Sequence, residues 1–238
     1  MHGNLEALTA VLADAAAQGA LGILCLGDLV GYGADPVACV EQLGERAVCV
    51  VTGNHEYGAL GLMDLDWFNP LARAAALWTR GRLDEDHRRY LQGLPVRTTL
   101  EDATLVHASP RHPDEWDYLI SAEDGFEVFG DFDTRLCFVG HSHRPGAWSL
   151  GSSGPEHVAH LTPSQSRVKL EDGRRYIINV GSVGQPRDRD PRAAYAIWDR
   201  DDRAVTIQRV EYDYRTAAAK IIAAGLPRPL ADRLANGL

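Results

Sequence analysis

The sequence predicts an α/β fold, built as one large domain over residues 1–238. Two apolar runs, LGILCL (21–26) and AVCVV (47–51), flank a helical stretch from about Asp35 to Glu45, and strand, helix, strand is typical of a parallel sheet. The second half of the chain is mostly strand-like. With 238 residues and 45% hydrophobic content, the chain can bury one sizeable core.

The first half alternates helices with buried strands. Asn4 can cap a helix in which apolar residues recur at helical spacing until Gly19 ends it. After the two apolar runs, the pattern is helical from Trp67 to Leu91 and returns to strand in PVRTTLE and ATLVH.

The second half predicts strands in RLCFVGHSH, GAWSL, RVKLEDGRRYIINVGS, AAYAIWD and AVTIQRVEY. Turns are expected at Asp172-Gly173 and Asp201-Asp202. The stretch GSSGPEH (151–157) is interpreted as a surface loop, and a last helix is expected from about Arg215 to Ala224.

Composition excludes several classes of function. A net charge of -9 and a pI near 5.4 argue against binding a nucleic-acid polymer, because that affinity rests on clustered Lys and Arg. No apolar run is long enough to span a bilayer, so no membrane partner and a cytoplasmic location are expected. The four cysteines form no CxxC pair and are interpreted as reduced core residues. The sequence does not decide whether the chain forms a homo-oligomer.

Polar residues that can bind metals follow the predicted strands, where open α/β sheets place their ligand sites. These residues are His2, Asp28, Asn54 with His55, His107, and His141 with His143. In an extended segment, residues i and i+2 point the same way, so His141 and His143 are expected to face one pocket while Ser142 faces elsewhere. The other histidines, at 87, 112, 157 and 160, lie in polar contexts and are expected to be exposed.

Taken in order, the segments HGN, GDLVGYG, GNHE, VHASP and GHSH resemble the calcineurin-like metallophosphoesterase superfamily, whose pattern is D-x-H, G-D, G-N-H-[DE], H and G-H-x-H. The ordered motifs span positions 2 to 143. The segment NVGSVGQPRDRDPRAAYAIWD resembles the closing strands of the small bacterial phosphodiesterase and diadenosine-tetraphosphatase-like branch. A lone Asp or Asn after a strand is usually a turn or cap residue, but five motifs in order make that interpretation of Asp28 and Asn54 a poor one.

The resemblance implies a four-layer α/β/β/α sandwich that holds two divalent metal ions. Asp28 would bridge the ions, His2 and His143 would bind the first, and Asn54, His107 and His141 would bind the second. Ligands of this mixture suit manganese, iron or zinc. Two such ions can activate a water as the hydroxide that attacks phosphorus, and His55 is the candidate to protonate the leaving oxygen or stabilise the phosphoryl charge.

One departure from the pattern concerns GDLVGYG. Protein Ser/Thr phosphatases and their closest relatives carry G-D-x-x-D-R-G, whereas Gly31 and Tyr32 stand here in place of the Asp and Arg. A protein-phosphatase role is therefore not expected, and Tyr32 either stacks on a nucleobase or packs. Arg111 and Arg187 are candidate phosphate contacts.

The second departure is at the start of the sequence. In the family a buried strand and the Asp of D-x-H precede the HGN turn, and here Met1 occupies the x position. The fold is therefore expected to lack the usual first strand, and the first metal site to be weakened, with reduced turnover. One hypothesis is that the natural chain starts upstream of Met1. The alternative is that another segment fills the strand position, or that the Met1 amine donates to the metal.

The expected function is metal-dependent hydrolysis of a phosphodiester, phosphomonoester or dinucleoside polyphosphate of small size. The alternatives are symmetrical diadenosine-tetraphosphate hydrolysis specifically, or a non-catalytic scaffold whose metal site has decayed. Glu56 is interpreted as a solvent-facing acid without a role.

Overall fold

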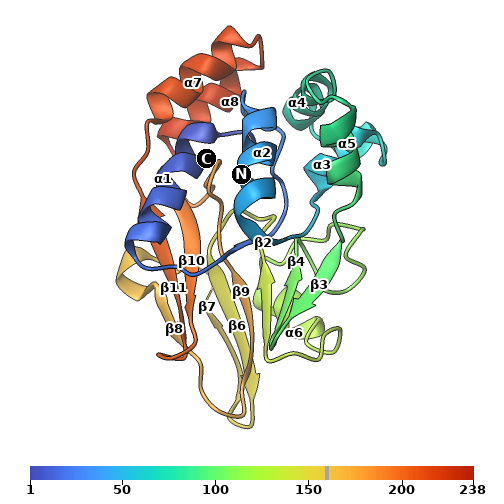
Figure 1. Cartoon of the computed structure of the whole chain (residues 1–238). Coiled ribbons are helices and arrows are strands. Elements are labelled where there is room, and N and C mark those ends of the chain that lie inside the picture. The colour runs from blue at the N-terminus through green and yellow to red at the C-terminus, as the bar shows by residue number, and fades with distance from the viewer. Residues whose placement is uncertain (159–160) are drawn as a thin grey trace.

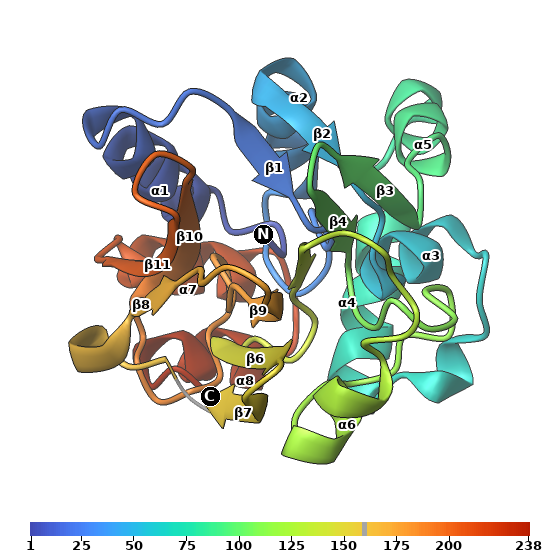
Figure 2. The ribbon, with the colours of Figure 1, turned by 90° about the horizontal axis from the view of Figure 1, so that it is seen from below.

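The computed structural model describes residues 1–158 and 161–238. Three sheets form the centre of the molecule (Figures 1 and 2). The largest has the order β3-β4-β5-β9-β6-β7, and the smaller two have the orders β10-β11-β8 and β1-β2. The strands are β1 (Ile23–Cys25), β2 (Ala47–Val50), β3 (Arg97–Leu100), β4 (Ala103–Val106), β5 (Leu136–Val139), β6 (Gly146–Gly151), β7 (Gly154–Val158), β8 (Arg167–Lys169), β9 (Arg175–Asn179), β10 (Ala193–Asp199) and β11 (Ala204–Val210).

Most helices gather at one end of the sheets, above the strands in Figure 1. The α-helices are α1 (Leu5–Ala17), α2 (Pro36–Arg46), α3 (Asn54–Leu60), α4 (Pro70–Arg80), α5 (Glu85–Gln92), α6 (Ala122–Glu127), α7 (Tyr214–Ala223) and α8 (Arg228–Asp232). Three 3-10 turns are η1 (Leu65–Trp67), η2 (Pro163–Gln165) and η3 (Arg233–Ala235). No helix within the described ranges combines the length and the apolar character that a membrane crossing needs.

The central strands of the large sheet, β4, β5 and β9, bury side chains on both faces. In β5, Leu136 and Phe138 face the core between the sheets, where Val205 and Ile207 of β11 meet them. Their neighbour Cys137 points to the opposite face, where Phe129 packs beside α6. This period-2 alternation puts apolar side chains on both faces of the sheet, as strands covered on both sides require.

Helices α1 and α2 cover the outer side of the smaller sheets. Leu8 of α1 and Leu43 of α2 pack with Cys25 of β1. Ala7 of α1 packs against Ala193 of β10. The layers are therefore helices, small sheets, large sheet and α6, which confirms the predicted four-layer α/β/β/α order. Among the described residues, β1 pairs with β2 alone, and no segment fills the place of the expected first strand.

Most predicted elements are present. The Asn4 side chain accepts a hydrogen bond from Ala7 N at 3.1 Å and caps α1, as its position before an apolar-periodic stretch predicts. The helix expected over 35–45 spans Pro36–Arg46, and the last helix spans Tyr214–Ala223. The four cysteines are free, and all but the half-buried Cys49 are buried.

The prediction of a surface loop at 151–157 is wrong. Gly154–Val158 forms β7, which pairs antiparallel with β6 through a turn at Ser152 and Ser153. Trp148 lies opposite His157 in this pairing, and their rings stack with centroids 4.8 Å apart. Pairing of the backbone with a neighbouring strand, which composition does not show, overrides the turn-rich sequence.

The histidines outside the strand ends differ from one another. His112 is exposed as expected, but His157 is half-buried against Trp148. His87 is also half-buried, with its ring nitrogens near the carboxylates of Asp84 and Glu41. The prediction of exposure is therefore wrong for these two, because each packs on a neighbouring element. Position 160 lies outside the described residues.

Candidate metal centre

Asp28 is the centre of the site. It follows β1, and its Oδ2 lies 3.4 Å from Nε2 of His2 and 3.2 Å from Nε2 of His107. Its Oδ1 accepts a hydrogen bond from the backbone N–H of His55 at 3.1 Å. All these side chains are buried. The end of β1, the start of α3, the end of β4 and the start of the chain thus converge on one carboxylate.

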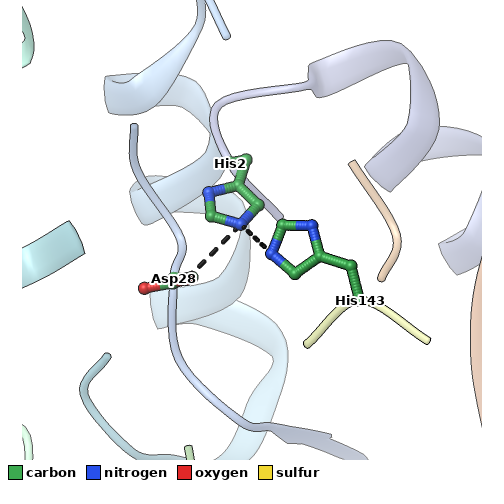
Figure 3. Close-up of side chains that lie close together, drawn as sticks. All are labelled: His2, Asp28 and His143. Carbon is green, nitrogen blue, oxygen red and sulfur yellow. Dashed lines mark hydrogen bonds and ion pairs between the residues drawn. The ribbon is translucent and has the colours of Figure 1, made fainter. Parts of the chain in front are cut away.

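Two groups of metal-binding side chains share Asp28. His2, Asp28 and His143 place one ligand atom each within 4.8 Å of one another, and Asp28, His107 and His141 do the same. Figure 3 shows the first group, with the imidazoles of His2 and His143 pointing toward each other beside the carboxylate. The resemblance implies the same side chains as ligands, with Asn54 added to the second group.

Backbone carbonyls fix the histidine tautomers. Nδ1 of His2 lies 3.2 Å from the carbonyl of Val30, and Nδ1 of His143 lies 2.6 Å from that of Gln185. A carbonyl oxygen can only accept, so Nδ1 carries the proton and Nε2 presents a lone pair. The two Nε2 atoms face each other 2.9 Å apart, an arrangement that a cation between them would stabilise.

The side-chain oxygen of Asn54 is a further possible metal ligand. It is the first residue of α3, and its Oδ1 is buried without a hydrogen-bond partner among the described residues. An amide oxygen left unpaired in the interior costs free energy, which a bound cation offsets. The two groups therefore fit a pair of divalent ions, and the unpartnered oxygen of Asn54 is compatible with the ligand role that the resemblance implies for it.

The electrostatics of the site favour a positive charge beside Asp28. Burial favours the neutral acid, yet His107, His55 and His2 hold the pKa of Asp28 well below its usual value. Burial opposes the charged form of His107 too, but the Asp28 carboxylate raises the pKa of that imidazole. Burial and then the charge of His107 lower the pKa of His141 to about 3, which keeps the imidazole neutral and leaves one ring nitrogen with a lone pair for a metal.

Left-handed backbone positions four of the ligand residues. His2, Asp28, His141 and His143 all have φ between 53° and 61°, a region that non-glycine residues visit at a cost and that clusters at functional sites. The expectation of an extended segment at 141–143 is therefore wrong, although both imidazoles reach the site, one in each group. Ser142 faces elsewhere as predicted, and its Oγ accepts a hydrogen bond from Nδ2 of Asn179 at 2.9 Å.

The side chain of Glu56 accepts hydrogen bonds from three backbone N–H groups, and its interpretation as a solvent-facing acid is wrong. The residue is fully buried. Its Oε2 accepts hydrogen bonds from the N–H groups of Asp28 and Gly53, both at 2.8 Å, and its Oε1 accepts one from Val30 at 3.1 Å. Burial and the nearby Asp28 charge raise the pKa of Glu56 to about 7, against the effect of the amides. The GNHE sequence holds the signal, since an acid at the third position of a helix can bond back to its cap.

His55 is held by packing. Its ring lies 4.4 Å from that of Tyr32 and 5.1 Å from that of Phe68. Nδ1 is buried without a hydrogen-bond partner in the described part of the chain, and burial lowers the pKa of the imidazole to about 4. A Cβ atom at Gly31 would lie 2.2 Å from this Nδ1. The absence of a side chain at position 31, where other branches carry Asp, is what makes room for His55.

Gly31→Ala is therefore expected to displace His55 and, if His55 has the catalytic role that the resemblance implies, to lower turnover by roughly 10- to 100-fold, since misplacing a catalytic group by about 1 Å has effects of that size. Gly31 has φ +86°, so alanine also strains the backbone. Gly19→Ala is the matched control, because Gly19 has φ +78° and nothing within 4 Å of the added Cβ. Steady-state kinetics that show equal turnover in both variants would contradict the packing role.

Two of the three candidate substrate contacts lie beside the metal centre. Tyr32 is buried, packs against the rings of His2 and His55, and its hydroxyl accepts a hydrogen bond from Nη2 of Arg187 at 3.2 Å. Of the two alternatives for Tyr32, the structure shows packing. Arg111 instead donates to Oδ2 of Asp131 at 3.0 Å and to a backbone carbonyl. Its charge is already paired with acids outside the ligand groups.

The amine of Met1 donates to the backbone carbonyl of Asp28 at 2.7 Å. This hydrogen bond ties the start of the chain to the backbone beside the first group, which consists of the side chains of His2, Asp28 and His143.

The chain is similar to known proteins over its whole length. The sequence model of the calcineurin-like phosphoesterase superfamily domain matches residues 1–203. An uncharacterized protein of Methanocaldococcus jannaschii is 40% identical over 243 residues, covering 100% of this chain and 95% of its own length. The crystal structure of a metallophosphoesterase from Sphaerobacter thermophilus is 44% identical, with a TM-score of 0.84 over 100% of this chain and 96% of that one. A hypothetical protein of Pyrococcus horikoshii shares the fold, with 20% identity and a TM-score of 0.77 over 100% of this chain and 95% of that one.

Proposed function

Because the chain belongs to the calcineurin-like phosphoesterase superfamily, we propose that it is a metal-dependent hydrolase of phosphoester bonds in a small substrate. The observation that carries the proposal is the Asp28 carboxylate shared by two groups of buried imidazoles. A carboxylate in this position can bridge two cations, and two adjacent cations are the arrangement that clamps a phosphoryl group.

The residues divide the chemistry among them. His2, Asp28 and His143 would hold one divalent ion, and Asp28, Asn54, His107 and His141 the other. When bound, such ions lower the pKa of a water and polarise the phosphoryl oxygens. His55 packs directly on the ring of His2, with centroids 4.8 Å apart, and is the proposed group that donates a hydrogen bond or a proton to the leaving oxygen. Tyr32 fixes the orientation of His55 through ring contact.

The two metal sites are unequal. Each group has three side chains, and in the proposed assignment Asn54, whose Oδ1 is buried without a hydrogen-bond partner among the described residues, gives the second a fourth ligand. Fewer donors give weaker binding, so we propose that the first site fills at higher metal concentration and limits turnover. Imidazole and oxygen donors suit manganese, iron or zinc.

The test is metal-dependent hydrolysis. The chain is treated with a chelator, then supplied with Mn²⁺, Zn²⁺ or Fe²⁺ and assayed with bis(p-nitrophenyl) phosphate, p-nitrophenyl phosphate and diadenosine tetraphosphate. We expect hydrolysis of at least one substrate, abolished by the chelator and restored by the metal. Hydrolysis of none of them by protein that carries two metal ions would favour the scaffold alternative. Turnover confined to diadenosine tetraphosphate would identify the narrower enzyme.

A further inference from the structure

Two guanidinium groups meet at one neutral acceptor beside the metal centre. Nη2 of Arg187, on the loop after β9, lies 3.0 Å from Oε1 of Gln185, and Nη1 of Arg233, in η3, lies 3.2 Å from the same oxygen. Gln185 is buried, and its backbone carbonyl accepts the hydrogen bond from Nδ1 of His143. One residue therefore connects a metal ligand to both arginines.

Neither arginine has a carboxylate partner among the described residues. Arg187 donates its other hydrogen bond to the Tyr32 hydroxyl, and Nε of Arg233 is buried without a partner. Burial and the charge of Arg187 lower the pKa of Arg233. Two half-buried like charges repel each other, and the arrangement is unfavourable until an anion joins them.

The surrounding chain holds the two arginines in place. Asp188 and Asp190, which follow Arg187 in the same loop, pair with Arg209 and Arg192, so these two acids are already occupied. The backbone N–H of Arg189 donates to the carbonyl of Gly237 at 2.9 Å, which ties this loop to the C-terminal segment that carries Arg233. A preorganised pair of guanidinium forks is suited to bind phosphate bidentately.

The position of the pair separates it from the reacting group. The Tyr32 ring contacts His2 and His55 with one part of its surface, while its hydroxyl reaches Arg187. Arg187 lies over the Tyr32 ring, with its Cζ 5.7 Å from the ring centroid, and Arg233 shares the Gln185 oxygen with it. Both arginines are thus neighbours of the ligand residues without belonging to either ligand group, so an anion bound by the pair is suited to be a second group of the substrate.

We propose that Arg187 and Arg233 bind a second phosphate group of the substrate, so that the preferred substrates carry two or more phosphates. This inference rests on the proposed hydrolase function for its meaning, but the binding can be measured without turnover. Arg233 is then a specificity-determining residue, contributed by the C-terminal segment, that the motifs do not include.

The experiment compares the binding of inorganic phosphate and inorganic triphosphate to the full chain by calorimetry, at equal free Mn²⁺. The variants are Arg233→Gln, Arg233→Lys and the matched control Arg228→Gln, whose side chain is exposed and pairs with Asp232. We expect Arg233→Gln to weaken triphosphate binding by about 10-fold or more and to leave phosphate binding unchanged, because a charge-assisted hydrogen bond is worth about 1.5–3 kcal/mol. Arg233→Lys, which keeps the charge without the fork, should be intermediate.

Equal triphosphate affinity in Arg233→Gln and in the unmodified chain would overturn the inference. An equal loss for phosphate and triphosphate would overturn it as well, because Arg233 would then act on the metal centre. Thermal unfolding of each variant identifies a folding defect, and if Arg233→Gln does not fold, Arg233→Lys decides. If Arg233→Gln weakens triphosphate binding but the unmodified chain hydrolyses no phosphoester, this inference stands and the proposed function is overturned.

Discussion

Asp28→Asn is expected to reduce metal content from two ions to at most one and to lower hydrolysis by more than 100-fold. The carboxylate is the one side chain common to both ligand groups, and asparagine removes its negative charge while keeping its shape. Changes in residues that only support a ligand already cost about 10- to 100-fold, so loss of the bridging charge should exceed that range. Elemental analysis of metal content together with initial rates checks the prediction.

The matched control is Asp133→Asn, because Asp133 is exposed and belongs to neither ligand group. This variant should keep metal content and rate. In the metal-free protein, Asp28→Asn should also unfold at a lower temperature than the unmodified chain, because the change removes one partner of the buried pair with His107. A fully active Asp28→Asn enzyme would contradict a shared-carboxylate site.

Glu56→Ala is expected to lower the free energy of unfolding by roughly 3–6 kcal/mol and to reduce activity with it. Three buried amide groups, those of Asp28, Val30 and Gly53, lose their acceptor, and each unsatisfied donor costs about 1–3 kcal/mol. Such a loss is a large part of a typical stability of about 5–15 kcal/mol. Urea unfolding, with activity measured on the folded fraction, gives both quantities.

Glu56→Gln tests how much of the effect comes from the hydrogen bonds and how much from the negative charge. The glutamine oxygen can still accept hydrogen bonds from Asp28 and Gly53, but its NH₂ group faces the N–H of Val30. The free energy of unfolding should therefore fall less than in Glu56→Ala. Glu115→Ala, at an exposed position, should leave stability within about 0.5 kcal/mol. An alanine variant at position 56 as stable as the Glu115 variant would show that the loop is held by other contacts.

The sequence predicts most strands and the histidines that gather around Asp28, for a physical reason. Apolar runs such as 21–26 end in short polar motifs, and both the burial of the run and the metal affinity of the motif are local properties of the chain. The layer order follows, because strands buried on both faces need helices on each side of the sheets.

Features that depend on tertiary contact were missed. The burial of Glu56 arises because the loop 28–30 folds over the start of α3. Arg233 lies 48 residues after Gln185 in the sequence and meets it only through docking of the C-terminal segment. The strand β7 exists because β6 offers a pairing edge. Local sequence patterns carry no information on such tertiary partners. Glu56 is the exception, because an acid at the third position of a helix is a capping signal that is visible in the sequence.

The most direct test of the account is an anomalous difference map from crystals of the full chain grown with Mn²⁺, measured near the manganese absorption edge. The account predicts two peaks about 3.5–4 Å apart, both in contact with the Asp28 carboxylate, one beside His2 and His143 and the other beside His107, His141 and Asn54. No peak at Asp28, or a single peak held by other residues, would contradict a two-metal phosphoesterase.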